Sequence, residues 1–178
     1  MTAIVTDRVA PEQATTLKKS WLLLTAAVLA LTVGFGAIAG GVFGAWYTWD
    51  QAAAQKIVTP EDAAIPETAV RGPFTMWAQA DIITHHQLDR TGGLYYSEME
   101  RMVPAVDENG QPVLDESGEQ VMVPNEARAS WLDATTLTTA LSVGILSYAL
   151  SAMAVAIGLT LVFIGFVFLR IRNKAVLL

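Results

Sequence analysis

Two long stretches without a charged side chain constrain this sequence more than any other feature. Residues 20–49 and 134–169 contain no Asp, Glu, Lys, Arg or His. A helix needs about 20 mostly apolar residues to cross the hydrocarbon of a bilayer, so each stretch is long enough to span one. Burying two such helices inside a soluble protein would need many more residues than the 178 present. We therefore expect an all-α membrane protein built on an antiparallel hairpin of two transmembrane helices.

Basic residues beyond the outer ends of these stretches predict the orientation of the hairpin. They are Arg8, Lys18, Lys19, Arg170, Arg172 and Lys174. Because basic residues next to a span favour the cytoplasmic side, both termini are expected in the cytoplasm, with the protein in the plasma membrane. The predicted divisions are a cytoplasmic segment (1–19), a first transmembrane helix (20–49), an extracytoplasmic acidic segment (50–133), a second transmembrane helix (134–169) and a cytoplasmic tail (170–178).

Aromatic residues stand near the ends of the stretches, as they do at membrane–water interfaces: Trp21, Trp46, Tyr47, Trp49 and Trp131. A cleaved signal peptide is the alternative reading of the first stretch, since the three alanines at 52–54 could resemble a cleavage site. The stretch is much longer than the roughly 7–15 apolar residues of a signal peptide, so we expect the helix to be retained.

Charge and cysteine content exclude several functions. Residues 48–134 carry fifteen acidic and five basic residues, a net −10, and the remainder carries six basic and two acidic residues, a net +4, which together give −6. Nucleic-acid binding depends on Lys and Arg that neutralise phosphates, so nucleic acid is not an expected partner. With no cysteine, the chain cannot form disulfides, thiolate-held iron–sulfur clusters, c-type haem attachment or cysteine-ligated zinc sites.

Both apolar stretches carry small residues at helical spacing. The first has one face of Ala27, Ala30, Gly34, Ala37, Gly41 and Gly44, and an adjacent GxxxGxxxG series of Gly36, Gly40 and Gly44. The second has Gly144, Ser147, Ser151, Ala154, Gly158 and Gly165 in the same register. Helices in lipid associate by close backbone approach through such residues. The two stripes are expected to face each other, or to dock in part on a helix of another protein; both can hold, because the first span offers two small-residue faces.

The first half of the connecting segment predicts one well-defined helix. Residues 50–58 read as a polar continuation of the first span, residues 59–62 as a turn or helix start, and residues 63–72 as an irregular linker. Residues 73–91 have helical spacing of apolar side chains and are followed by Gly92 and Gly93, a usual helix stop. Ser97 and Glu100 fit a capping box and predict a short helix ending near Met102.

An internal repeat follows in the second half. Residues 106–113 and 114–121 each place an acidic turn ending in Gly between β-favouring residues. In the first copy, Asn109 and Gly110 both tolerate positive φ, which is a strong hairpin signal. We predict a small β-meander with strands near 102–106, 111–114 and 119–123. Asn125 is then placed to cap a helix that leads into the second span.

One group of side chains is a candidate metal site. Asp81, His85 and Asp89 fall at i, i+4 and i+8 on the 73–91 helix. His86 is the only other histidine, and adjacent residues on a helix point about 100° apart, so one helix hardly directs both imidazoles at one ion. The alternative is that these groups make structural hydrogen bonds or contact a partner. No nucleophile–base pair or phosphate-binding loop is found in the sequence, so no metal, cofactor or catalytic residue is assigned to this chain.

The run from Gly72 to Gly93 (GPFTMWAQADIITHHQLDRTGG), set between two spans, resembles a known family. It is similar to small two-span actinobacterial membrane proteins that are often labelled ring-opening dioxygenases. One branch of that family is the accessory subunit, or supercomplex association factor, of the respiratory supercomplex of a menaquinol–cytochrome bcc reductase and a cytochrome aa3 oxidase. The 19.1 kDa chain fits the size of that subunit. The segment 103–124 is longer than the resemblance implies.

The resemblance implies a non-catalytic accessory subunit whose partners are membrane lipid and subunits of the bcc reductase and the aa3 oxidase, which hold the haems and copper. The dioxygenase label would require two convergent histidines and a carboxylate on iron, which the chain does not readily supply. Two alternatives stay open: a free-standing membrane protein with an external metal- or ligand-sensing segment, and a protein whose GxxxG faces pair with a second copy of itself.

Overall fold

The computed structural model describes residues 10–175, with side chains described for residues 21–174. The chain is mostly helical and divides into two compact units. We call Met1–Tyr47 with Ser147–Leu178 the helix-pair unit, and Thr48–Leu146 the loop unit. Of the basic residues used to predict orientation, Arg8 lies outside the described residues, and the side chains of Lys18 and Lys19 lie outside the described side chains.

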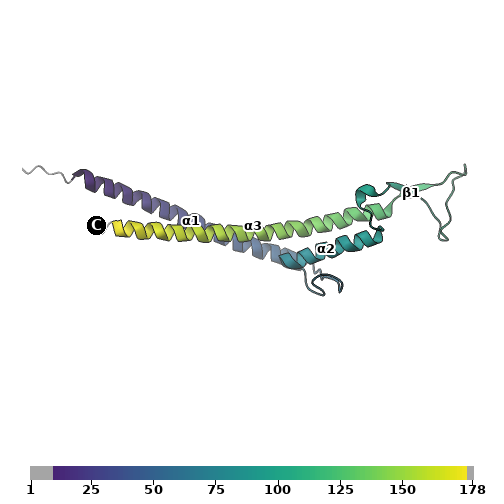
Figure 1. Ribbon diagram of the computed structural model, residues 1–178, viewed down its shortest axis with the longest axis horizontal. Coiled ribbons are helices and arrows are strands. Elements are labelled where there is room, and N and C mark those ends of the chain that lie inside the picture. Colours follow the sequence, from purple (N-terminus) through teal and green to yellow (C-terminus); the bar gives the residue numbers. More distant parts are fainter. Residues whose placement is uncertain (1–9, 176–178) are drawn as a thin grey trace, which may run out of the picture. The chain divides into compact units, whose positions relative to one another are not determined.

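Two long helices dominate the chain, α1 (Ala10–Ala54) and α3 (Glu126–Ala175) (Figure 1). No proline falls between position 11 and position 60, or after position 124, so nothing interrupts the backbone hydrogen bonds of either helix. Both helices are longer than the uncharged stretches within them. The first was expected to continue to residue 58 but ends at Ala54, and Lys56 adopts a left-handed φ of 55° just after it.

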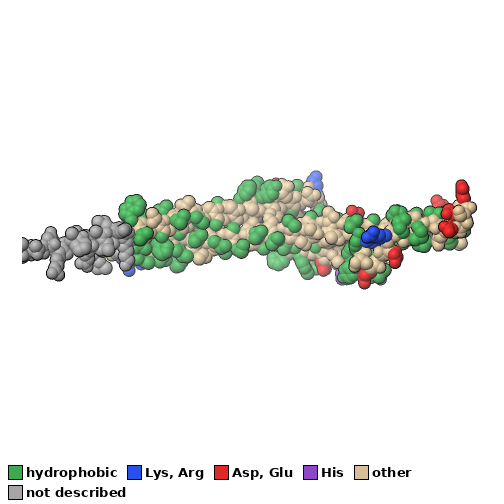
Figure 2. All heavy atoms as spheres, turned by 90° about the horizontal axis from the view of Figure 1, so that it is seen from above, with side chains coloured by type: hydrophobic (Ala, Val, Ile, Leu, Met, Phe, Trp, Pro, Cys, Tyr) green, Lys and Arg blue, Asp and Glu red, His purple; other side chains and the backbone are tan. Residues whose placement is uncertain are grey.

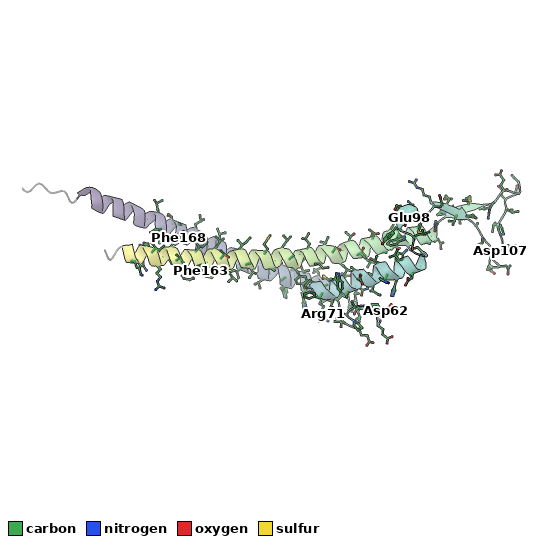
Figure 3. All side chains as sticks on the ribbon, in the orientation of Figure 1. Asp62, Arg71, Glu98, Asp107, Phe163 and Phe168 are labelled. Atoms are coloured by element: carbon green, nitrogen blue, oxygen red, sulfur yellow. The ribbon has the colours of Figure 1, made fainter. Side chains whose placement is uncertain are left out.

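Both helices are long and apolar enough to cross a membrane. Only 11% of the most apolar window of each helix is buried within the described chain. Large apolar side chains point outward: Leu22 is 68% exposed, Leu29 67% and Phe163 69%. Figure 2 shows hydrophobic side chains over the visible surface of these helices, and Figure 3 shows Phe163 projecting from the ribbon of α3.

The expected helix of the connecting segment is confirmed as α2 (Pro73–Arg90). Pro73 occupies its first turn, where a missing N–H is harmless. Beyond its last residue, the Gly92 N–H donates to Asp89 O and the Gly93 N–H donates to Leu88 O (2.8 Å). This Schellman arrangement needs a left-handed residue after the helix, and Gly92 supplies it with a φ of 63°.

Within the loop unit, α2 packs against the first part of α3. The buried amide of Gln87 donates to Ser130 Oγ (2.6 Å), and Met76, also buried, reaches Gly144. Trp131 was expected at a membrane interface, but it is only 7% exposed, and its Nε1–H donates to Leu94 O (3.0 Å). Its ring stacks on Tyr95 at 5.5 Å, so this tryptophan serves the core of the loop unit.

Hydrogen bonds between its two ends close the loop that follows α1. Thr59 is 2% exposed; its N–H donates to Thr68 O (3.0 Å), and the Thr68 N–H donates to Thr59 Oγ1 (2.9 Å). The Arg71 guanidinium lies over the Trp49 ring, 5.4 Å from its centroid. Residues 57–70 thus form a closed loop, and the irregular linker expected over residues 63–72 is held in it by hydrogen bonds.

The short helix expected at Ser97 is instead a 3-10 helix, η1 (Tyr96–Glu98). Its capping carboxylate is Glu98, whose Oε2 accepts the Tyr95 N–H (2.8 Å), so the box lies two residues before the predicted pair. Asn125 does cap α3: its Oδ1 accepts the Arg128 N–H (3.1 Å).

The predicted β-meander is wrong in its pairing. The structure has two strands, β1 (Met102–Pro104) and β2 (Met122–Pro124), which pair directly with each other and place Val103 opposite Val123. The segment expected as the middle strand, 111–114, makes only single bridges. The turn takes up about half of each eight-residue repeat, so few residues remain on either side of it to pair as strands. In addition, Pro112 has no N–H to donate to a neighbouring strand.

Candidate functional site

The small residues of α1 and α3 meet in the helix-pair unit at a regular interval. Ala27, Gly34 and Gly41 are buried on α1, and Ser151, Gly158 and Gly165 are buried on α3. Successive members are seven residues apart on both helices. The other expected members of both stripes within this unit, Ala30, Ala37, Gly44, Ser147 and Ala154, are partly buried beside them. A seven-residue interval keeps one seam of each helix facing its partner.

Glycine is required at this seam because the two backbones nearly touch. A Cβ added at Gly41 would lie 2.6 Å from Ser151 O, and one at Gly158 would lie 2.6 Å from Gly34 O. A Cβ at Gly165 would lie 2.7 Å from the side chain of Leu31. A carbonyl oxygen cannot move away without moving its helix, so even alanine at positions 41 or 158 would separate the helices locally.

The second small-residue face of α1 is open. A Cβ added at Gly36 or Gly40 would meet nothing within 4 Å among the described residues. The third member of that series, Gly44, differs: a Cβ there would lie 2.8 Å from Ser151 Oγ, so it belongs to the seam with α3. The face formed by Gly36 and Gly40 is therefore available to another helix, and we call it the open glycine face.

Gly144 contacts a different element from the one expected. It was grouped with the α3 stripe that faces α1, but its neighbour is the Met76 side chain of α2, 2.7 Å from the site of an added Cβ. The thioether fills the space that the missing side chain leaves, because methionine is flexible enough to enter such a gap. Gly144 thus serves the packing of the loop unit.

A shallow groove of about 470 Å³ runs beside the seam. Its walls are mostly small or β-branched side chains, among them Ala45 of α1 and Ala152 and Ala156 of α3, and the Tyr148 side chain also lines it. The groove is almost wholly apolar, so its lining presents few polar groups to a ligand.

The candidate metal ligands do not form a site with the other described residues. Asp81, His85 and Asp89 are all exposed on α2, and no group of three or more His, Asp or Glu side chains in the described part of the chain could hold a metal ion. His86 turns to a different partner: its Nε2 lies 2.6 Å from Asp62 Oδ2. The Asp62 partner of His86 comes from the loop after α1 and is not one of the candidate ligands.

The contact with His86 has an electrostatic signature. The hydrogen bond to His86 holds the pKa of the Asp62 carboxyl below its ordinary value of 3.8, because it favours the ionised form. Both side chains are about half exposed, so the pair fastens the 57–70 loop to α2 but forms no enclosed site. Figure 3 labels Asp62 of this loop and Arg71, which follows it directly.

Sequence reasoning missed two features that the structure brings together. The contacts of Gln87 and Leu94 with residues 127–131 join positions about 40 apart in sequence, and no local pattern predicts such a pairing. The second is the hydrogen-bonded arrangement of residues 105–122, for which the internal repeat was the available signal. No protein family, curated protein or solved structure matches this chain.

Proposed function

We propose that this chain is a two-span membrane protein acting as a non-catalytic accessory subunit of a respiratory supercomplex of menaquinol–cytochrome bcc reductase and cytochrome aa3 oxidase. In this proposal the hairpin spans the plasma membrane, both termini lie in the cytoplasm, and the loop unit lies on the extracytoplasmic side. The chain stabilises or bridges the assembly by helix packing and extracytoplasmic contacts. Haems and copper belong to its partner subunits.

The open glycine face carries the proposal of helix docking. The antiparallel partner α3 already covers the seam formed by Gly34 and Gly41, yet Gly36 and Gly40 keep a second smooth face that no described residue covers. In lipid, a smooth face gains stabilisation only when another backbone approaches it closely, because lipid tails solvate apolar side chains as well as a protein does. A helix of a neighbouring subunit is the partner that such a face accommodates.

The aromatic side chains support the proposed position in a bilayer. Phe43 lies 5.7 Å from Trp46 and 6.2 Å from Tyr47, and all three are largely exposed close to the end of the helix-pair unit. Rings with a polar atom are favoured at headgroup depth. At the other end of this unit, Arg170, Arg172 and Lys174 follow the apolar part of α3, which supports a cytoplasmic C-terminus.

The identity of the partners comes from the resemblance carried by residues 72–93. In the structure this run coincides with α2, its N-cap Gly72 and its closing glycines. In this proposal the run has a packing role, since Met76 and Gln87 of α2 contact residues of α3.

Cysteine cross-linking in native membranes tests the proposal. The chain has no cysteine, so Gly40→Cys introduces a single thiol on the open glycine face. We expect adducts to subunits of the reductase or oxidase, and co-purification of a- and b-type haem spectra with the tagged chain. Phe163→Cys, on an exposed lipid-facing position, is the matched control and should give far less adduct. Self-adducts at position 40 would replace this proposal by self-association, and haem-free purification with no adduct would refute it.

A further inference from the structure

Residues 105–122, which we call the hairpin head, form a closed ring of backbone hydrogen bonds. The Ala105 N–H donates to Val121 O (2.7 Å), the Val121 N–H to Val113 O (2.9 Å), and the Val113 N–H to Ala105 O (2.9 Å). These three residues are eight apart in sequence, which is the length of the internal repeat. The repeat thus gives three equivalent positions around one ring, and the head is an ordered structure rather than a loose acidic loop.

Two identical turns lock this ring. Asp107 Oδ1 accepts the N–H groups of Asn109 (2.9 Å) and Gln111 (2.8 Å), and Asp115 Oδ1 does the same for Ser117 and Glu119. Only the glycine of each turn has positive φ, 76° at Gly110, so the turn differs from the two-residue type predicted for Asn-Gly. The backbone bonds hold the pKa of Asp107 below its ordinary value.

The ring presents apolar side chains to its surroundings. The residues after the three ring members are Val106, Leu114 and Met122, which are 61%, 58% and 49% exposed. Because they follow equivalent ring positions, they surround the ring in equivalent places. Nothing in the described chain covers them. Exposed apolar surface that is rimmed by polar residues is a common feature of interaction sites.

A groove continues this surface toward the base of the head. It has a volume of about 570 Å³ and is lined by residues of both strands and the start of α3, including Val103, Val123 and Pro124. Pro104 and Pro124 sit at the strand positions that face outward rather than toward the partner strand. Since proline has no N–H, these edges are poorly suited to accept an added strand, and an occupant must bind through side chains.

The charge around the apolar ring indicates the chemistry of the occupant. Residues 102–125 contain five acidic residues and no Lys or Arg. All five are exposed, and Figure 2 shows acidic side chains collected at this end of the loop unit. Asp107 is labelled at the head in Figure 3. An apolar surface bordered by one sign of charge is complementary to an apolar patch bordered by the opposite sign.

We propose that the hairpin head docks on a basic extracytoplasmic surface of another protein, inserting Val106, Leu114 and Met122 between Lys and Arg side chains of that surface. This rests on the proposed function for its membrane sidedness and for the expectation that the partner is a reductase or oxidase subunit. Anionic lipid and a second copy of the head are disfavoured as occupants, because each would repel five acidic residues.

Photo-crosslinking from the full chain in native membranes tests this docking. A p-benzoylphenylalanine at Leu114 should give an adduct whose mapped peptide is rich in Lys and Arg. In the otherwise unmodified chain, the adduct yield should fall as NaCl is raised to about 0.5 M, where the Debye length is well below 10 Å. Glu108→Lys with Glu116→Lys should lower the yield about tenfold. Glu61→Lys with Asp81→Lys makes the same charge change on exposed positions outside the head and should leave the yield unchanged.

The outcomes separate this proposal from the proposed function. A head adduct with a basic segment of a protein outside the respiratory chain would uphold the docking and overturn the supercomplex assignment. Adducts only with lipid or with a second copy, no adduct, or a yield insensitive both to salt and to charge reversal would overturn the docking. That result would leave the assignment standing if Gly40→Cys still cross-links to reductase or oxidase subunits.

Discussion

Single alanine substitutions at matched glycines should have opposite effects on the association of α1 with α3. Gly41→Ala should destabilise the helix pair, whereas Gly36→Ala should leave it unchanged or slightly more stable. Both positions lie mid-helix on α1 and both changes add one methyl group. They differ in what the methyl meets: Ser151 O at 2.6 Å for position 41, and nothing within 4 Å for position 36.

The magnitude follows from that distance. Ordinary contact with a Cβ begins at 3.4 Å, so the helices must separate by 3.4 − 2.6 = 0.8 Å near position 41. A gap of that size forfeits about a quarter to a half of the dispersion energy of the atom pairs that it separates. Overpacking of this kind costs about 1–3 kcal/mol. The intrinsic helix preference of alanine over glycine, about 1 kcal/mol, is common to both variants and cancels in their difference.

Spin labels report the separation and the stability together. The chain has no cysteine, so Val28→Cys and Phe163→Cys give clean labelling at exposed positions of α1 and α3. The distance between the labels is followed as dodecylmaltoside is exchanged for SDS. Gly41→Ala should lower the SDS fraction at the midpoint and lengthen the distance before the transition, and Gly36→Ala should do neither.

Equal destabilisation by the two substitutions would refute this assignment of faces. It would mean that α3 covers the Gly36 side as well, and that no open glycine face exists for a partner. A larger destabilisation by Gly36→Ala than by Gly41→Ala would mean that α3 packs against the Gly36 side of α1 and not against the Gly41 side. Gly34→Ala provides a second test, since its Cβ would lie 2.9 Å from Gly158 O, and it should behave as Gly41→Ala does.

Three further predictions concern the loop unit. Ser130→Ala should destabilise this unit by about 1–3 kcal/mol, because it removes the closest partner of the buried Gln87 amide. In thermal unfolding, the loss of stability in the double variant Gln87→Leu with Ser130→Ala should differ from the sum of the losses in the two single variants. Gly92→Ala should cost about 1 kcal/mol through its left-handed φ, whereas Gly92→Asn should cost less, as seen by the same melting curves. The Asp62 carboxyl should titrate below 3.8 by carbon NMR and return toward that value in His86→Ala; since its folded pKa is lowered, the pair stabilises the fold above pH 3.8 and this contribution is lost as the pH falls through the folded pKa.

Patterns that depend on neighbours along the chain predicted the structure well. The two long helices follow from uncharged stretches without proline, and the stop of α2 follows from Gly92 and Gly93. Asn125 caps α3 because the oxygen of a short polar side chain directly before a helix can accept a hydrogen bond from a free N–H of the first turn. The small-residue spacing also identified both faces of α1, since helical periodicity alone determines which residues share a face.

Tertiary contacts set the features that the sequence did not predict. Trp131 looked like an interfacial residue because it precedes a span, but the Leu94 carbonyl and the Tyr95 ring, close to it only after folding, draw it into the core of the loop unit. Gly144 fitted a stripe facing α1, yet Met76 arrives from α2 and takes that place. The repeat at 106–121 predicted the positions of two turns, but not their type and not that its ends pair with each other, because nothing local distinguishes a meander from a closed ring.

The unit boundary explains why the second uncharged stretch is longer than a membrane requires. Its 36 residues would extend about 54 Å as a helix, against roughly 30 Å of hydrocarbon. The structure assigns residues up to Leu146 to the loop unit, which leaves 23 residues, 147–169, or about 34 Å. The remaining uncharged residues, 134–146, include the buried Ala134 and Leu141, and Gly144, which receives Met76. Part of their apolar character therefore serves packing inside the loop unit, and in the proposed arrangement α3 combines a membrane span with the scaffold that supports this unit.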